Sequence, residues 1–238
     1  MAADTQRRVG EVLAWMKRRG SQRNIDGMAR YGIVADKVFG ISVGTLRAKA
    51  KQLGRDHALA LALWKTGWYE ARMLSAFIDD PKALTAGQMG QWAKTFDNWA
   101  ICDTACFHLF DKSPLAWARI RVWHRRKDEF VRRAAFALMA SMALHDRKAD
   151  DALFLPCLPM IAAAATDERN FVKKGVSWAL RGIGRRSAAL HAPAMTLAQE
   201  LAQSSSPSAR WIGKDAIKDL STTATRKALA RTAARRAR

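Results

Sequence analysis

Hydrophobic residues recur at helical spacing along most of the chain. Between Thr5 and Arg19, for example, Val9, Val12 and Met16 fall on one face of a helix. The same spacing predicts a short helix carrying Met28 and Tyr31, and then helices near 45–53, 56–64, 68–78, 85–96, 99–110, 113–123, 128–145, 150–164, 169–185, 189–203 and 207–220. No segment alternates polar and apolar residues for long enough to predict a strand. The pattern therefore predicts an all-α fold.

The predicted helices are separated by short breaks made of turn and capping residues. Gly54 is expected to end one helix and Asp56 to begin the next, and Asp79-Asp80-Pro81 marks a later break. In the middle of the chain, helix pairs recur about every 35–45 residues, which is the range of HEAT-like repeats. We therefore predict an α-solenoid of HEAT-like antiparallel helix pairs.

A weak internal repeat supports this architecture. Residues 129–135 resemble residues 170–176, since in both an apolar pair is followed by a basic pair and then by small residues. The basic pairs are Arg132 with Arg133 and Lys173 with Lys174. In a solenoid, equivalent helices line one concave surface, so these pairs predict a basic groove for a phosphate backbone. The alternative is two ordinary solvated helix faces.

The charge of the chain points to a polyanionic partner. Lys and Arg number 41 against 21 Asp and Glu, a formal net charge of +20. Such a domain repels itself unless it meets a polyanion. We expect this polyanion to be nucleic acid. An anionic membrane surface is the second candidate, and a generally basic proteome is the third explanation.

We expect one domain over residues 1–221. Residues 222–238 are basic with few large apolar side chains, and we expect a flexible tail that adds non-specific affinity.

Several classes of protein are disfavoured by composition. Three cysteines without a C-x-x-C motif argue against a disulfide framework or a zinc site. The five histidines form no pair one helical turn apart, and no P-loop or dinucleotide fingerprint is present. No signal peptide or membrane span is recognisable. We therefore expect a soluble cytoplasmic protein, associated with the nucleoid, that binds no metal or cofactor.

One pair of residues suggests a chemistry. Trp99 and Asp103 stand one helical turn apart and so share a face. An indole ring attracts cations, and a carboxylate can stabilise a developing oxocarbenium ion. For each residue alone, an ordinary structural role is the stronger interpretation: a tryptophan is usually part of the core, and an aspartate near a helix start usually acts as a cap or complements the helix dipole.

Four short runs, taken in order, resemble motifs of the DNA alkylation repair family, the AlkD-type glycosylases built of HEAT-like repeats. The runs are Met-Ala-Arg-Tyr ending at Tyr31, Trp-x-x-x-Asp from Trp99 to Asp103, Arg-Ala-Ala beginning at Arg133, and Trp-x-Leu-Arg from Trp178 to Arg181. The resemblance extends from about residue 26 to 220. This chain departs from the family pattern at Asn98 and Ala100, which flank Trp99. The interval between Arg133 and Trp178 is also longer than in the family pattern.

The resemblance implies a glycosylase that removes cationic alkylated purines, 3-methyladenine and 7-methylguanine, without enclosing the flipped base. It implies that Asp103 stabilises the oxocarbenium-like transition state and positions water, while Trp99 and Trp178 flank the sugar. Tyr31 and Arg133 would contact DNA, and the remaining DNA contacts would come from Arg132, Lys173, Lys174 and Arg181. The expected partner is double-stranded DNA carrying alkylated bases, bound by a monomer.

Two alternatives stay open from the sequence. A non-catalytic HEAT-like protein that binds DNA or RNA needs the basic groove but not Asp103. A protein–protein scaffold, the less favoured alternative, needs neither and predicts no salt-dependent affinity for DNA.

Overall fold

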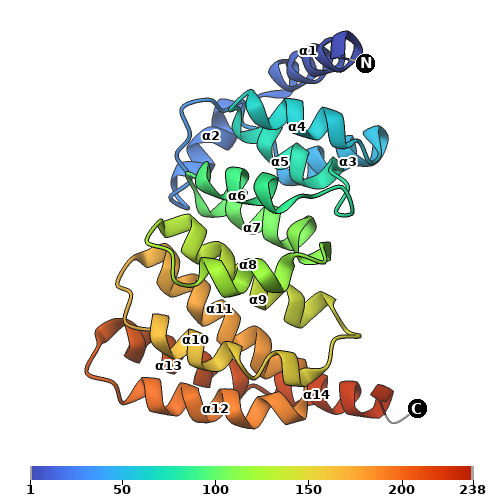
Figure 1. Ribbon diagram of the computed structural model, residues 1–238. Coiled ribbons are helices and arrows are strands. Elements are labelled where there is room, and N and C mark those ends of the chain that lie inside the picture. The colour runs from blue at the N-terminus through green and yellow to red at the C-terminus, as the bar shows by residue number, and fades with distance from the viewer. Residues whose placement is uncertain (1, 237–238) are drawn as a thin grey trace. The chain divides into compact units, whose positions relative to one another are not determined.

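The computed structural model describes the backbone of residues 2–236, which form fourteen α-helices and two short 3₁₀ helices, with no strand in that range (Figure 1). The prediction of an all-α fold is confirmed. The helices are α1 (Ala2–Arg19), α2 (Gln22–Ala29), α3 (Val43–Leu53), α4 (His57–Lys65), α5 (Tyr69–Ile78), α6 (Ala86–Lys94), α7 (Trp99–His108), η1 (Phe110–Lys112), α8 (Ala116–Trp123), α9 (Glu129–His145), η2 (Asp151–Leu153), α10 (Cys157–Ala164), α11 (Asn170–Arg186), α12 (Ala188–Ala202), α13 (Pro207–Leu220) and α14 (Thr223–Arg236).

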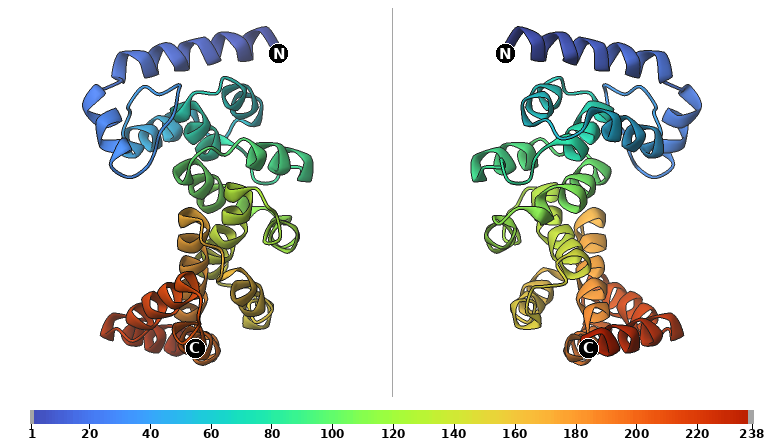
Figure 2. Two further views of the ribbon diagram at one scale, coloured as in Figure 1. Left: turned by 90° about the vertical axis from the view of Figure 1, so that its left-hand side faces the viewer. Right: turned by 90° about the vertical axis from the view of Figure 1, so that its right-hand side faces the viewer.

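The chain divides into two compact units, residues 1–115 and residues 116–238. In the first unit α3 packs against α5 and α5 against α7, while α4 packs on both α5 and α1 (Figure 2). Leu46, Leu63 and Leu74 are fully buried between these helices. The expectation of a single domain over residues 1–221 stays a prediction.

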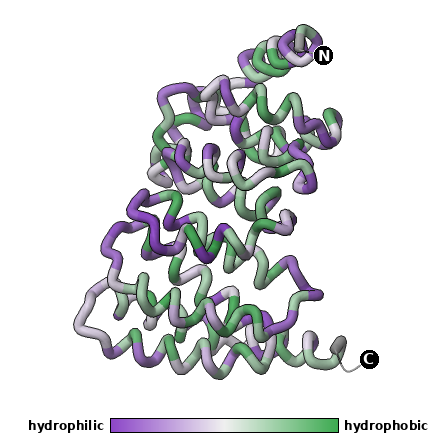
Figure 3. Tube along the Cα trace, viewed as in Figure 1, coloured by the Kyte–Doolittle hydropathy of each residue, from purple (hydrophilic) through white to green (hydrophobic). Residues whose placement is uncertain are grey.

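The second unit repeats this arrangement. The long helix α11 packs along α9 on one side and against α13 on the other, and α12 and α14 also contact α11. Close packing depends on small residues: a Cβ atom added at Gly213 would lie 2.3 Å from the backbone nitrogen of Ala202. Hydrophobic and hydrophilic residues interleave along most helices, as amphipathic helices require (Figure 3). Layered helix pairs of this kind are the predicted HEAT-like architecture.

Local signals in the sequence explain where most helices begin and end. The carboxylate of Asp56 accepts a hydrogen bond from the backbone nitrogen of Leu59, 2.9 Å away, and so caps α4. Gly54 ends α3 with a positive φ of 71°, a conformation that glycine adopts without steric cost. Both boundaries confirm the sequence predictions.

One prediction of secondary structure was wrong. The helix expected over 150–164 is divided into η2 and α10, because Pro156 has no backbone N–H to donate to a continuous helix. The segment expected to be a basic flexible tail contains α14, where Thr225 and Leu229 are buried. The flexibility of this segment stays a prediction. The side chains of Arg235 and Arg236, and the whole of Arg238, lie outside the described residues. Within residues 2–236, no helix is both long enough and apolar enough to cross a membrane.

Candidate nucleic-acid interface

The start of α7 carries the predicted carboxylate. Asn98 caps the helix by accepting a hydrogen bond from the backbone nitrogen of Ile101 at 3.0 Å. Trp99 is the first residue of α7 and Asp103 follows one turn later, and both are partly exposed while the residues between them are largely buried. The structure therefore presents the indole and the carboxylate from one short, capped helix.

Tyr31 is brought to the same place. The indole nitrogen of Trp99 donates a hydrogen bond to the backbone carbonyl of Tyr31, 3.0 Å away. The side chain of Tyr31 is 73% exposed, in the turn that follows α2. Three residues that the sequence placed in one site, Tyr31, Trp99 and Asp103, are thus neighbours in the first unit.

A buried carboxylate anchors the segment that connects Tyr31 to α3. Glu70 of α5 has no exposed surface and accepts hydrogen bonds from three consecutive backbone nitrogens, Phe39 at 2.9 Å, Gly40 at 2.6 Å and Ile41 at 3.1 Å. The backbone nitrogen of Tyr69 also donates to the carbonyl of Lys37 at 2.8 Å. Helical spacing alone does not reveal the role of Glu70, because its partners lie about 30 residues away along the chain.

We expect Glu70→Ala to loosen this segment. Three amide groups, two of them in buried hydrogen bonds, would lose their acceptor, at a cost of about 1–3 kcal/mol for each group left buried and unsatisfied. Hydrogen exchange should show faster exchange at the amides of residues 39–41, and denaturation should show lower stability. Glu70→Gln keeps one oxygen acceptor and should give a smaller effect. Unchanged exchange at these amides in Glu70→Ala would contradict the anchoring role.

A second set of contacts holds the loop before α7. Arg72 forms an ion pair with Asp97 at 3.0 Å and donates to the carbonyl of Thr95 at 3.2 Å. The same guanidinium lies 5.8 Å above the ring of Trp64, which stacks on Trp92 with 3.8 Å between ring centroids. These contacts fix the backbone that leads into Trp99.

The face of α7 toward the core carries two buried thiols. Cys102 and Cys106 are fully buried. Burial raises the pKa of Cys106 well above its usual range, and the hydrogen bond with Cys102 and the negative charge of Asp103 act in the same direction. Cys106 therefore stays a neutral thiol, as expected for a core residue. In the described part of the chain, no group of three or more His, Cys, Asp or Glu residues is placed to hold a metal ion.

In the second unit, the basic pair of α9 already has protein partners. Arg132 pairs with Asp167 at 2.9 Å. Arg133 is only 6% exposed, and its guanidinium donates to the carbonyl of Phe171 at 2.5 Å, which ties α9 to α11. Asp167 also pairs with Arg169 at 2.7 Å, and that partner lowers the pKa of the Asp167 carboxyl below its usual value. The phosphate-binding roles of Arg132 and Arg133 stay predictions.

The basic pair of α11 is more accessible. Lys174 is exposed, and the ammonium group of Lys173 lies 5.1 Å from the centre of the Trp211 ring. Trp211, on α13, is 39% exposed, a large fraction for an indole. Trp211 was not among the residues predicted from the sequence, although tryptophan beside lysine on a basic surface is a recurrent nucleic-acid contact.

The late tryptophan motif is also on α11. Trp178 is half-buried. Arg181 lies 3.3 Å from the carboxylate of Asp215, which accepts a hydrogen bond from the Ser177 hydroxyl at 2.5 Å. Arg181 therefore links α11 to α13, and its contact with DNA stays a prediction. The predicted residues are divided between the units, with Tyr31, Trp99 and Asp103 in the first.

The fold is that of the HEAT-like repeat proteins. The chain is similar to a solved structure described as a new family of proteins related to the HEAT-like repeat DNA glycosylases with affinity for branched DNA structures. The TM-score is 0.72 and the sequence identity is 20%, over 80% of this chain and 82% of that chain. No curated protein matches the sequence.

The family follows from the sequence itself. A family model described as DNA alkylation repair enzyme matches residues 12–232. The chain belongs to the DNA alkylation repair enzyme family, and the resemblance seen in its motifs is confirmed.

Proposed function

We propose that this protein is a DNA glycosylase that hydrolyses the N-glycosidic bond of cationic alkylated purines. The observation that carries the proposal is the arrangement on α7, where Asp103 follows Trp99 by one turn and Trp99 is fixed to the turn containing Tyr31. Membership of the DNA alkylation repair enzyme family supports it. The net charge of +20 suits a double-stranded DNA partner.

The chemistry requires few groups. A base alkylated at N3 or N7 carries a positive charge and leaves as a neutral molecule, so no general acid is needed. Asp103 stabilises the positive charge that develops on the deoxyribose and orients the attacking water. The ring face of Trp99 adds a favourable contact with the cationic sugar, and Tyr31 presses on the duplex beside the lesion.

The phosphate backbone is held mainly by the second unit. DNA can reach Lys174 and the Lys173–Trp211 pair without movement of these side chains. The arginines Arg132, Arg133 and Arg181 contact phosphate by sharing or exchanging their present partners. Trp178 adds an aromatic contact with DNA from the second unit. The protein acts on alkylated DNA as a monomer, without a cofactor, in the cytoplasm at the nucleoid.

Product analysis tests the substrate class. Duplex DNA treated with a methylating agent is incubated with the protein, and the released bases are separated and identified. We expect 3-methyladenine and 7-methylguanine, which are cationic in DNA, and no O⁶-methylguanine, which is neutral. Release of neutral lesions at a similar rate would contradict the mechanism, because a neutral base needs a general acid.

A second candidate is a protein that binds DNA without cleaving it. The structurally similar protein belongs to a family with affinity for branched DNA structures. Binding to a four-way junction and to a linear duplex of equal length, measured at the same salt concentration, separates the candidates. A strong preference for the junction without release of any base would favour the binding protein.

A further inference from the structure

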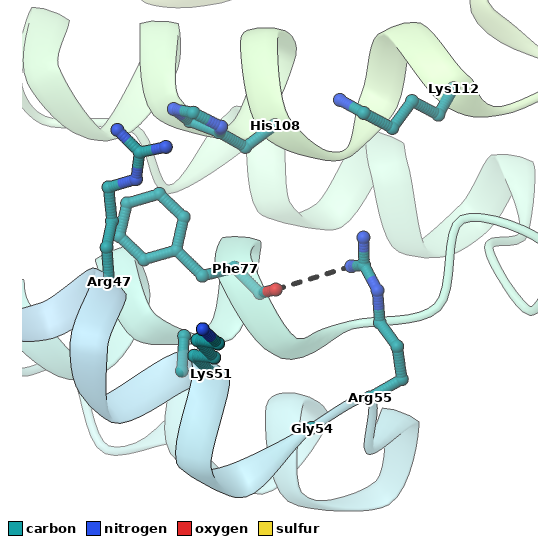
Figure 4. A pocket seen from close by; sticks show the side chains of 8 residues that line it. Arg47, Lys51, Gly54, Arg55, Phe77, His108 and Lys112 are labelled. Carbon is teal, nitrogen blue, oxygen red and sulfur yellow. Dashed lines mark hydrogen bonds between the residues drawn. The ribbon is translucent and has the colours of Figure 1, made fainter.

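A second basic site lies in the first unit. An open cavity of about 360 Å³ is formed by α3, α5, α7 and η1 together with the turn that follows α3 (Figure 4). Its polar and aromatic lining consists of Arg47, Lys51, Arg55, Phe77, His108 and Lys112. Within the described residues, this lining includes neither Trp99 nor Asp103.

The charged side chains that line the cavity are all positive. Four of its lining residues are cations, and none of the described lining residues is acidic. Arg47 and Lys51 are one turn apart on α3, and both are exposed. Because like charges gathered in one cavity repel each other, the arrangement is most favourable with an anion between them.

Two of the four cations are held in place by the protein. The guanidinium of Arg55 donates to the carbonyl of Asp79 and, at 3.3 Å, to that of Phe77 (Figure 4). The ammonium group of Lys112 donates to the carbonyl of Phe107 at 3.0 Å and pairs with the Asp111 carboxylate at 2.9 Å. Fixed cations lose little entropy when they bind an anion, and this favours binding.

An aromatic pair gives the cavity a rigid wall. The rings of Phe77 and His108 meet edge to face with 4.9 Å between their centroids. Figure 4 shows the Arg47 guanidinium beside these rings, opposite Arg55 and Lys112. An anion bound here has cations on two sides.

We propose that this cavity binds a phosphate group of DNA, at a site separate from Asp103. Planar guanidinium groups and point-like ammonium groups are the side chains that recognise phosphate. The proposal rests on the DNA-binding part of the proposed function. These side chains can bind either an internal phosphodiester or the phosphate at a strand end. In both cases the protein would contact its DNA at a second place.

The test compares two double variants with the same loss of charge. Arg47→Gln with Lys51→Gln removes the two cations that α3 contributes to the cavity. Lys82→Gln with Lys94→Gln removes two exposed cations of the same unit that do not line the cavity. Denaturation confirms that each protein is folded, and Lys51→Arg, which keeps the charge, is expected to retain affinity.

Three DNA probes distinguish the source of the phosphate. They are a covalently closed duplex circle and a short linear duplex with either 5′-phosphate or 5′-hydroxyl ends. If the cavity holds an internal phosphate, the cavity variant should bind all three about tenfold more weakly, and the slope of log affinity against log salt should fall by about one. If it holds a terminal phosphate, only the preference for 5′-phosphate ends should be lost.

Equal affinities of the cavity variant and the control variant for all three probes would overturn the proposal. Absence of salt-dependent DNA binding by the wild type would overturn both this proposal and the proposed function. Wild-type binding without base release would contradict only the glycosylase activity, because the comparison of the two variants measures binding alone.

Discussion

Replacing Asp103 with asparagine is expected to reduce the rate of base release by on the order of 10²–10³-fold. Asparagine has nearly the same shape, but it lacks the negative charge that stabilises the oxocarbenium-like transition state. Single-turnover release of 7-methylguanine from a methylated duplex measures the effect. DNA affinity should stay unchanged or rise slightly, because a carboxylate near the phosphate backbone repels it.

The matched control is Asp26→Asn on α2. Asp26 is exposed and accepts a hydrogen bond from Gln22 at 2.9 Å, within the same unit as Asp103. Its replacement removes the same charge and should change the rate less than about threefold, since salt screens an exposed charge. Equal rate losses in both variants would assign the effect to net charge rather than to the position of Asp103.

Arg186→Ala is expected to give the largest loss of stability. The side chain of Arg186 is only 3% exposed, and its guanidinium lies 4.2 Å from the centre of the Phe154 ring. It pairs with Asp151 at 2.9 Å and donates to the carbonyls of Ala143 at 3.2 Å, Asp146 at 2.7 Å and Ala149 at 2.5 Å. Removal of one partner of a buried ion pair costs about 3–5 kcal/mol.

The neighbouring Arg185 provides the comparison. Its side chain is 50% exposed and pairs with Asp219 at the surface. Surface ion pairs contribute about 0–1 kcal/mol, so Arg185→Ala should lower the free energy of unfolding far less than Arg186→Ala. Chemical denaturation of both variants measures the difference. Similar losses would show that Arg186 does not hold the segment between α9 and α10 as its contacts indicate.

The sequence predicted features that depend on local rules. Helix positions follow from the spacing of apolar residues, and the ends at Gly54 and Asp56 follow from backbone conformation and capping. The Trp99–Asp103 pair could be placed on one face because both residues belong to one helix. The resemblance to known motifs supplied the rest of the candidate site.

Long-range polar contacts could not be predicted in the same way. Helical spacing shows which face of a helix is polar, but not which polar group meets which across the fold. Arg133 was expected to contact phosphate, yet it is buried against the carbonyl of Phe171. The contacts of Glu70 with the segment before α3, and of Lys173 with Trp211, depend likewise on how distant helices pack.

The most direct test of the central claim is single-turnover release of 7-methylguanine by the wild-type protein, compared with spontaneous loss of the same base from the same duplex. DNA binding is measured in parallel. The proposed function predicts release well above the spontaneous rate, at a protein concentration that saturates the DNA. Saturated binding with release no faster than the spontaneous rate would contradict it and would leave a DNA-binding member of the family.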